Sequence, residues 1–366
     1  MPLSYFNRTL RLLDAPRKTR RYSEGQSSSG GVATRVIVST ATEPYWNLAF
    51  EEYLYHERRK YEDDSKWIYL WRNKPSVIIG RNQNPWQECN VPFIEKNGIN
   101  LVRRQSGGGT VYHDLGNTCV TVLSAKHEPH LNVAFTCRAV QSAFGIQAYP
   151  GPRNDIYLDG CKVSGSAFRV SSIASYHHYT LLVNTDLSTL KSALLPIHRP
   201  FETKAISSVR APTKNLGECS TKAITHEILC DVLEKHFKLA FPGDCWVVRE
   251  EYHLERIQSI HFVAKTYEEF KSWEHIYGKT PPFHLSFQGS LGSKLCIIDI
   301  YVNNGMIKEF SVSHPTLTDE SKRALRNSVI GLRYEWADFN SCLKREGFVI
   351  HENSETKNLS NKNVTR

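Results

Sequence analysis

The stretch from Arg103 to Asn117 reads RRQSGGGTVYHDLGN, with two arginines directly before three consecutive glycines. Adjacent glycines contribute nothing to packing and lose the most conformational freedom on folding, so a run of three needs a reason. In such a loop the backbone can approach a ligand closely, and N–H groups beside fixed positive charge make a receptor for phosphate. A flexible surface turn is the plain alternative, and it does not account for the flanking residues.

The residues that follow the glycines, from Thr110 to His113, are β-branched or aromatic and predict a strand. A P-loop and a Rossmann turn both continue into a helix, and their glycine spacing differs from that seen here. This phosphate loop therefore indicates a sheet-rich domain of another kind.

Further blocks on both sides of the loop are similar, in order and spacing, to those of one family. They are WNLAFEE at 46–52, LWRN at 70–73, IGRNQNPW at 79–86, RND at 153–155, KVSGSA at 162–167, YHH at 176–178, TLL at 180–182 and SSVR at 207–210. Together with the glycine loop they resemble the lipoate-protein ligase and lipoyltransferase family. The resemblance extends from about residue 36 to residue 216, and several blocks in series are more specific than any single one.

The resemblance implies an α+β fold of the biotin/lipoate ligase kind, which is related to the cores of class II synthetases. Its catalytic domain has a mixed, largely antiparallel sheet flanked by helices, and a small α+β accessory domain follows. We expect the catalytic domain over residues 32–245, the accessory domain over 255–350 and a polar, disordered tail over 351–366. A length of 366 residues with 40% hydrophobic content is consistent with two modest domains.

Three local expectations bear on the site and the domain boundary. Residues 162–168 are expected to form one strand, residues 244–259 to be a connection, and a helix from Lys265 to Trp273 to begin the accessory domain. The block from Trp273 to Phe283 looks like the family's entry to that domain. The histidines of the YHH block lie in a predicted strand, where neighbouring side chains face opposite ways, so at most one of them can enter a pocket.

Composition limits the classes of partner. The formal charge of +9 is dispersed without a long basic block, so nucleic acid is not indicated, whereas acidic proteins and anionic adenylates are suitable partners. No run of about 18 apolar residues is present, so no membrane span is expected.

Nine cysteines without a Cys-x-x-Cys pair argue against a disulfide framework and a structural zinc site, and we expect no bound structural metal. A nucleophilic Cys161 beside the lysine block remains an alternative.

Residues 1–31 have the character of a mitochondrial targeting segment and linker. Leu3, Phe6, Leu10 and Leu13 fall on one helical face, the segment is rich in arginine, and a Ser/Gly-rich stretch follows. Cleavage after Tyr22 and a location in the mitochondrial matrix are expected. An ordinary N-terminal extension is the alternative.

Attaching an acyl group to a protein lysine requires an activated carboxyl, and the family's solution is an acyl-adenylate. By resemblance, Lys162 is the catalytic residue that stabilises charge on oxygen as the acyl–phosphate bond breaks. The resemblance assigns the binding of lipoyl-AMP or ATP to Arg104, Gly107, Gly108, Gly109, Thr110, Val111, Tyr112, Arg153, Asp155, Lys162, Thr180, Thr203 and Ala205. It assigns the acyl pocket to Arg81, Ser106, Gly165, Ala167 and His178.

The sequence leaves two alternatives for each of two acidic residues and one arginine. Asp114 and Asp155 are candidates for magnesium or adenosine contacts, and capping of a turn is the alternative for each. Arg103 is expected to face away from Arg104 along the strand and to serve packing or to meet solvent.

Three functions follow from these residues. The preferred one is a mitochondrial lipoyltransferase that moves a lipoyl or octanoyl group from lipoyl-AMP, or from the lipoylated H protein of glycine cleavage, to the lysine of E2 lipoyl domains of 2-oxoacid dehydrogenases. The alternative is an ATP-dependent lipoate-protein ligase that uses lipoate, ATP and Mg²⁺. The third is a binding protein without turnover, which the intact loop and Lys162 disfavour. A biotin-protein ligase shares the fold but has a different glycine loop. A monomer is expected.

The late segments YGKTPPF at 277–283 and SVIG at 328–331, with the targeting segment, are more similar to the animal-type transferase. The glycine loop, RND and KVSGSA blocks match the ligase pattern equally well. The sequence therefore favours the transferase and leaves the ligase open.

Overall fold

The computed structural model describes residues 34–61, 63–196, 201–242 and 248–351. The expected targeting segment and nearly all of the expected tail lie outside these residues. The chain divides into two compact units, one of Met1–Arg81, Ile99–Ser192 and Ser208–Lys271, and one of Asn82–Gly98, Ala193–Ser207 and Ser272–Arg366. Each unit is described by itself.

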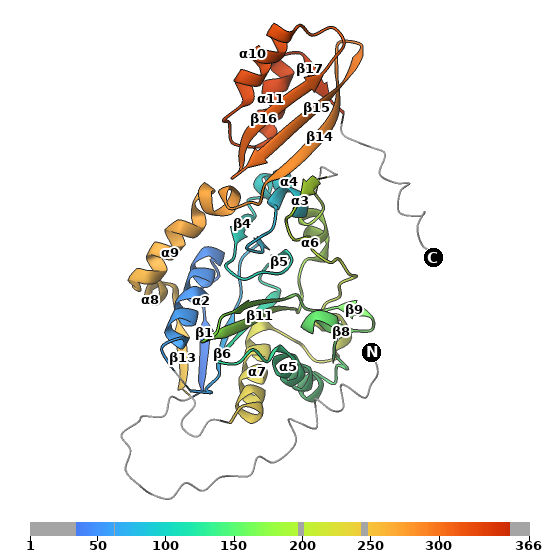
Figure 1. Ribbon diagram of the computed structural model, residues 1–366. Helices are drawn as coiled ribbons and strands as arrows, with labels where there is room; N and C mark the ends of the chain where they lie inside the picture. Colours follow the sequence, from blue (N-terminus) through green and yellow to red (C-terminus); the bar gives the residue numbers. More distant parts are fainter. Residues whose placement is uncertain (1–33, 62, 197–200, 243–247, 352–366) are drawn as a thin grey trace, which may run out of the picture. The chain divides into compact units, whose positions relative to one another are not determined.

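The first unit is built on a six-stranded mixed sheet (Figure 1). Its order is β10 (Ser166–Val170), β11 (Ser175–Leu182), β6 (Asn117–Ser124), β2 (Trp67–Trp71), β1 (Arg35–Ser39) and β13 (Val248–Tyr252). Neighbouring strands are antiparallel from β10 to β2, and β1 is parallel to both β2 and β13. The sheet is therefore mixed with an antiparallel majority, as expected.

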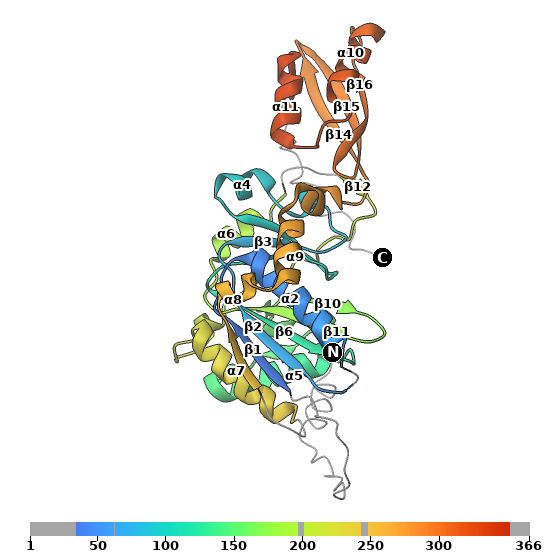
Figure 2. The same cartoon turned by 90° about the vertical axis from the view of Figure 1, so that its left-hand side faces the viewer.

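Two helices cover one face of this sheet. Helices α5 (Pro129–Phe144) and α7 (His226–Ala240) lie together on the same side of β1, β2 and β6 in both views (Figures 1 and 2). Every second residue of the strands, such as Val36, Ile68 and Val120, joins their core because side chains alternate along a strand. Proline in its first turn starts α5, and a left-handed Gly145 ends it.

Helix α2 (Pro44–Arg58) packs on the opposite face. Its Phe50 ring meets Tyr69 of β2 edge to face, with centroids 5.5 Å apart. Two further helices, α8 (Leu254–Gln258) and α9 (His261–Lys271), pack against α2, where Trp46 and Tyr267 stack at 3.8 Å. The helix α2 is thus enclosed, which explains why most of its residues are buried.

Two small sheets complete the first unit. One has the order β4 (Asn100–Arg103), β3 (Ser76–Ile79) and β5 (Val111–His113), and the other has β7 (Tyr149–Pro150), β8 (Ile156–Leu158) and β9 (Cys161–Lys162). The glycine loop joins β4 to β5, and the short helix η1 (Pro152–Asn154) joins β7 to β8. Helices α6 (Leu187–Ala193) and η2 (Leu216–Cys219) follow β11 in the chain.

The strand expected over residues 162–168 is wrong as a single element. Lys162 pairs with β8 and with a neighbouring segment, its N–H donating to Pro212 O at 2.8 Å, whereas Ser166 begins the pairing with β11. The chain crosses between sheets at Gly165, where a Cβ would lie 2.8 Å from Val111 Cγ1. Local propensity cannot reveal this change of partner strand, because the residues before and after Gly165 are both extended.

The connection expected over residues 244–259 is also wrong. Residues 248–252 form the edge strand β13, paired with β1, and α8 follows. The segment reads VREEY and lacks apolar alternation, so its strand conformation depends on pairing with β1. Helix α9 belongs to the first unit, and the second unit resumes at Ser272, later than the boundary we expected at 255.

The second unit has an antiparallel sheet with the order β12 (Phe201–Thr203), β14 (Phe283–Leu291), β15 (Lys294–Asn303) and β16 (Met306–Ser313), and β17 (Phe348–Ile350) pairs with β14. Alternate residues of β14 are buried against the helices α10 (Asp319–Val329) and α11 (Trp336–Arg345), which contribute Leu325, Val329 and Phe339 to the core. The short helices α3 (Pro85–Glu88), α4 (Val91–Lys96) and η3 (Glu274–Gly278) also belong to this unit.

Candidate active site

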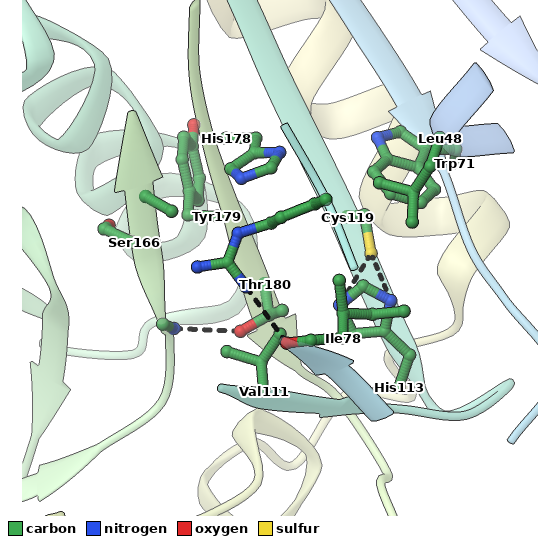
Figure 3. A pocket seen from close by; sticks show the side chains of 13 residues that line it. Leu48, Trp71, Ile78, Val111, His113, Cys119, Ser166, His178, Tyr179 and Thr180 are labelled. Atoms are coloured by element: carbon green, nitrogen blue, oxygen red, sulfur yellow. Dashed lines mark hydrogen bonds between the residues drawn. The ribbon is translucent and has the colours of Figure 1, made fainter. Parts of the chain in front are cut away.

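A narrow pocket lies on the face of the central sheet that α2 covers (Figure 3). Leu48 of α2, Trp71 of β2, Cys119 of β6 and His178 of β11 contribute to its walls, and Val111 closes it from the small sheet. About 340 Å³ of space, part of it open to solvent, lies between the atoms, and the exposed lining is almost entirely apolar. A narrow apolar pocket of this kind suits a slender apolar chain.

Strand register brings these walls together. Cys119 lies between Trp71 on one neighbouring strand and Thr180 on the other, so the three side chains share a face. His178 is two residues from Thr180 and lines the same pocket, whereas His177 does not line it. The His177 ring contacts Asn132 and Ser166 instead. Only one histidine of the pair therefore enters the pocket, as strand alternation requires.

The glycine loop is held from behind by Arg104. This buried guanidinium donates hydrogen bonds to the carbonyl oxygens of Ile78 at 3.0 Å, Gly107 at 2.6 Å and Gly109 at 2.7 Å. Burial lowers the pKa of Arg104 to about 10, so it stays charged at neutral pH. The sequence predicted a phosphate contact for Arg104. The structure places its charge against loop carbonyls, where it shapes the loop.

The three glycines have different local reasons. Gly108 has a φ of +85°, and a Cβ there would lie 3.1 Å from both Ala167 Cβ and Arg104 Nη2. A Cβ on Gly109 would lie 3.1 Å from Ser208 Oγ, whereas one on Gly107 would meet nothing within 4 Å. Among the described residues, no protein group accepts a hydrogen bond from the N–H of Gly108 or Gly109. These two donors suit an anionic ligand.

Lys162 and Asp155 form an ion pair beside the pocket. Lys162 Nζ lies 2.7 Å from Asp155 Oδ2, and the two side chains are 20% and 8% exposed. Asp155 Oδ1 accepts the N–H of Ser166, a pocket residue, at 2.9 Å. The carboxylate therefore fixes the lysine ammonium at the start of β10. Asp155 thus positions Lys162, and the magnesium or adenosine contact considered from the sequence stays a prediction.

Several expected pocket residues are brought together here. Gly165, Ala167, Thr180 and His178 all line the pocket, and Gly165 N donates to Thr180 Oγ1 at 2.9 Å. The crossing at Gly165 thus joins the Lys162 side of the site to the sheet. Ser106 lies directly behind His178, with its Oγ 2.8 Å from His178 Nε2.

Other expected residues lie elsewhere. Arg81 is exposed and does not line the pocket, although its N–H donates to Ser106 O at 2.9 Å. Arg153 is exposed with a φ of +63°. Thr203 and Ala205 belong to the second unit, where Ala205 N donates to Thr203 Oγ1 at 3.1 Å.

Four further residues near the loop are held by the surrounding fold. Asp114 caps a turn by accepting the N–H groups of Gly116 at 2.9 Å and Asp186 at 2.8 Å. Tyr112 is buried, and Thr110 N donates to Ser208 Oγ at 2.9 Å. Arg103 is buried and donates to the carbonyl of Arg81 at 3.1 Å, so it serves packing.

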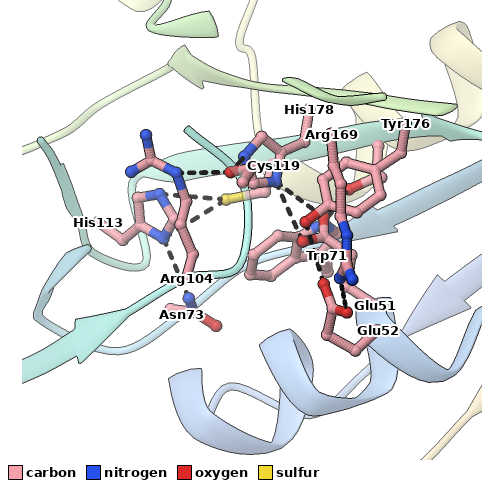
Figure 4. Close-up of polar contacts among 12 residues, drawn as sticks. Glu51, Glu52, Trp71, Asn73, Arg104, His113, Cys119, Arg169, Tyr176 and His178 are labelled. Carbon is pink, nitrogen blue, oxygen red and sulfur yellow. Dashed lines mark hydrogen bonds and ion pairs between the residues drawn. The ribbon is translucent and has the colours of Figure 1, made fainter. Parts of the chain in front are cut away.

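Sequence reasoning missed a polar cluster behind the pocket (Figure 4). Glu51 of α2 is 1% exposed, and its carboxylate lies 2.9 Å from His178 Nδ1. His113 is buried beside Asn73, whose Nδ2 is 3.0 Å from His113 Nδ1. Burial, reinforced by the neighbouring His178 and Arg104, lowers the pKa of His113 to about 3, so His113 is neutral. The available signal was the pair of glutamates at 51 and 52 inside an apolar helix, because buried carboxylates need a reason.

An apolar pocket beside free backbone donors and a partly buried Lys–Asp pair can hold an acyl chain, its carbonyl and an attached anionic group. On an α+β domain of this topology, the arrangement defines an acyl-activating or acyl-transferring enzyme. No group of three or more metal-ligating side chains occurs among the described residues. The described helices are also too short or too polar to cross a membrane.

Comparison with known proteins identifies the family. Residues 43–238 match the family described as the lipoyl protein ligase A/B catalytic domain. A lipoate-protein ligase A of Bdellovibrio bacteriovorus is 35% identical over 306 residues, which cover 82% of this chain and 88% of that protein. This chain belongs to the lipoate-protein ligase family, as the sequence blocks predicted, and it is an enzyme of the amide-forming type.

Solved structures agree. The LipL1 protein of P. falciparum, in complex with lipoate, has a TM-score of 0.60 at 28% identity, covering 86% of this chain and 94% of that one. A structure from Thermoplasma acidophilum, described as a bi-partite lipoate protein ligase and its E2 lipoyl domain, has a TM-score of 0.53 at 22% identity, covering 67% and 95%. The expected lipoate/biotin ligase fold is thereby confirmed.

Proposed function

We propose that this chain is a lipoyltransferase of the mitochondrial matrix that transfers a lipoyl or octanoyl group to the lysine of E2 lipoyl domains. The observation that carries the proposal is the Lys162–Asp155 pair beside an apolar pocket and a glycine loop with free N–H groups. The acyl chain would occupy the pocket, and the adenylate phosphate would meet Gly108 and Gly109. Lys162 would lie where the acyl carbonyl and the phosphate join.

The reaction replaces one acyl bond with another. The neutral Nζ of the acceptor lysine attacks the acyl carbon, an amide bond forms, and the bond between that carbon and the phosphate oxygen breaks. AMP leaves with the electron pair of the broken bond, and one proton of the attacking amine passes to water. Lys162 would stabilise the negative charge that gathers on the acyl and phosphate oxygens, while the apolar walls keep water from the activated carbonyl.

The acceptor and donor proteins are part of the proposal. E2 lipoyl domains are the favoured acceptors because the structure from Thermoplasma acidophilum is described as a lipoate protein ligase and its E2 lipoyl domain. The lipoylated H protein of glycine cleavage is a second donor, in which case the bond that breaks is the amide to the donor's lysine. The dispersed charge of +9 would assist docking of acidic partners. The enzyme is proposed to act as a monomer.

An ATP-dependent lipoate-protein ligase is the second candidate. It is favoured by the relatives, which are named lipoate-protein ligase A and align with more than four fifths of this chain. In that case the same pocket and loop would hold lipoate and ATP, and the enzyme would form lipoyl-AMP before transfer. A binding protein without turnover has no observation in its favour.

One assay separates the candidates. The protein, cut after Tyr22, is incubated with an unmodified E2 lipoyl domain in three separate reactions. The first contains lipoate and Mg-ATP, the second lipoyl-AMP, and the third lipoylated H protein. Acylation only from the preformed donors supports the transferase. Acylation from free lipoate and ATP establishes the ligase, and failure with all three donors overturns both.

A further inference from the structure

A chain of hydrogen bonds runs behind the pocket from its far wall towards the glycine loop (Figure 4). At the first end, Trp71 Nε1 donates to Thr121 Oγ1 at 3.0 Å, and this hydroxyl donates to Glu51 Oε1 at 2.6 Å. The two oxygens of the Glu51 carboxylate lie 2.9 and 3.1 Å from His178 Nδ1. All four residues are buried.

The chain continues from His178 to the loop. His178 Nε2 lies 2.8 Å from Ser106 Oγ, and Ser106 Oγ lies 2.8 Å from Arg104 Nε. Nη2 of this guanidinium donates to the carbonyls of Gly107 and Gly109. A continuous path of side chains thus links the pocket wall to the backbone that would meet the phosphate.

The chemistry of the end groups sets the direction of the bonds at both ends. Trp71 and Arg104 can only donate, and a carboxylate can only accept. Nδ1 of His178 therefore carries a proton that faces Glu51. In a neutral ring, Nε2 then accepts the hydroxyl proton of Ser106, whose oxygen accepts the Nε–H of Arg104. Glu51 is the acceptor at which both halves of the chain end.

We propose that Glu51 is a positioning residue for acyl transfer. It holds His178 in the Nδ1–H tautomer, and through Ser106 it fixes the guanidinium of Arg104 and so the shape of the glycine loop. The N–H groups of Gly108 and Gly109 then stay in place for the phosphate of the acyl-adenylate. This inference rests on the proposed function for its kinetic consequence, and it requires no contact between Glu51 and the substrate.

The neighbouring carboxylate offers a matched control. Glu52 is equally buried on the same helix, but it pairs with Arg169 and accepts the hydroxyl of Tyr176 at 3.1 Å. Neither Arg169 nor Tyr176 belongs to the series of hydrogen bonds that ends at the glycine loop. A glutamine at either position replaces one buried carboxyl group, so a general loss of stability would affect both variants.

The test uses the full chain with ¹⁵N-labelled histidine, together with steady-state kinetics on lipoyl-AMP. In the wild type we expect the NMR signals of His178 to show a protonated Nδ1 and an unprotonated Nε2. In Glu51→Gln the amide can donate to Nδ1, so the tautomer should reverse. The KM for lipoyl-AMP should then rise by about tenfold to a hundredfold, with a smaller change in kcat. Losses of this size are typical when a residue that orients a binding group, without touching the ligand, is replaced.

Two further variants test the path itself. Glu51→Asp keeps the carboxylate and should recover part of the loss, with the tautomer unchanged. Ser106→Ala leaves the Glu51–His178 contact intact but cuts the link to Arg104, so it should raise KM without reversing the tautomer. Glu52→Gln should leave both the tautomer and the KM unchanged, even where its melting temperature falls.

An unprotonated Nδ1 in the wild-type protein would overturn the proposal, and this reading depends on neither activity nor the folding of a variant. An equal rise of KM in Glu52→Gln would also overturn it, because the effect would then be general. If the tautomer is as stated but the wild type transfers no lipoyl group, the proposed function fails while the assignment of the hydrogen bonds holds.

Discussion

Lys162 shows how a single residue acquires its place from distant parts of the chain. Its backbone pairs with Tyr157 and Pro212, and its ammonium is held 2.7 Å from the Asp155 carboxylate. A lysine that would move freely on a surface is thereby confined beside the pocket. Confinement of this kind lets a charge act without reorganisation during the reaction.

Replacing Lys162 tests that role directly. Lys162→Met should lower kcat/KM for lipoyl-AMP by about 10²- to 10³-fold, the usual loss when one preorganised charge is removed. Steady-state kinetics with an E2 lipoyl domain measure the effect. Lys214→Met is the control, because the N–H of Lys214 donates to Lys162 O at 3.2 Å while its side chain pairs with Asp159 instead. A kcat/KM for Lys162→Met within twofold of that control would exclude a catalytic role for Lys162.

At the scale of elements, the loop between β4 and β5 depends on one glycine more than on its neighbours. Gly108 has the left-handed φ and the closest approach to Ala167, whereas Gly107 has an ordinary φ and open space. Arg104 reinforces the same geometry by binding the carbonyls on either side of Gly108. The loop therefore has a defined shape that its own contacts hold in place.

Alanine substitutions should separate the two positions. Gly108→Ala should destabilise the protein by about 1–3 kcal/mol, because the added Cβ combines backbone strain with close contacts. Gly107→Ala should be neutral or stabilise it by up to about 1 kcal/mol, since alanine restricts the unfolded chain. Urea unfolding of both variants provides the measurement. Equal losses at the two positions would show that the loop does not have the conformation described.

At the scale of the whole molecule, buried histidines make stability depend on pH. Burial lowers the pKa of His226 to about 4 and that of His177 well below its ordinary value. An unfolded histidine titrates near 6.5, so the unfolded chain binds more protons than the folded one below that pH. The contribution of each histidine is complete above about pH 6.5 and is lost as the pH falls towards its folded value.

A variant at His226 isolates one such contribution. Between about pH 6 and 4.5, the free energy of unfolding of the wild type should fall more steeply than that of His226→Gln, by at most about 1.4 kcal/mol per pH unit. Comparing slopes removes the opposite contribution of Glu52, whose pKa burial raises to about 7. The exposed His261 is the control, and His261→Gln should keep the wild-type slope. Parallel slopes for the wild type and His226→Gln would contradict the assignment.

Elements with strong local signals were predictable from the sequence. The residue pattern predicts a strand at Trp67–Trp71 and a short helix at Val91–Lys96, and the structure has both with these bounds. It also predicts helices over 133–144 and 225–239, where α5 and α7 lie. Apolar periodicity, capping residues and proline act within a few residues, so they are visible in the sequence. The ordered blocks around the glycine loop were equally sufficient to predict the family.

The sequence by itself determined the glycine loop, the lysine block, the family and most of the strong helices and strands. Tertiary structure alone decided the break at Gly165, the recruitment of β13, the place of Arg104 behind the loop and the link from Glu51 to His178. These features join residues far apart in the chain, and Glu51 and His178 are separated by 127 positions. Such contacts form only when the sheet register is complete, so no local pattern of residues can reveal them.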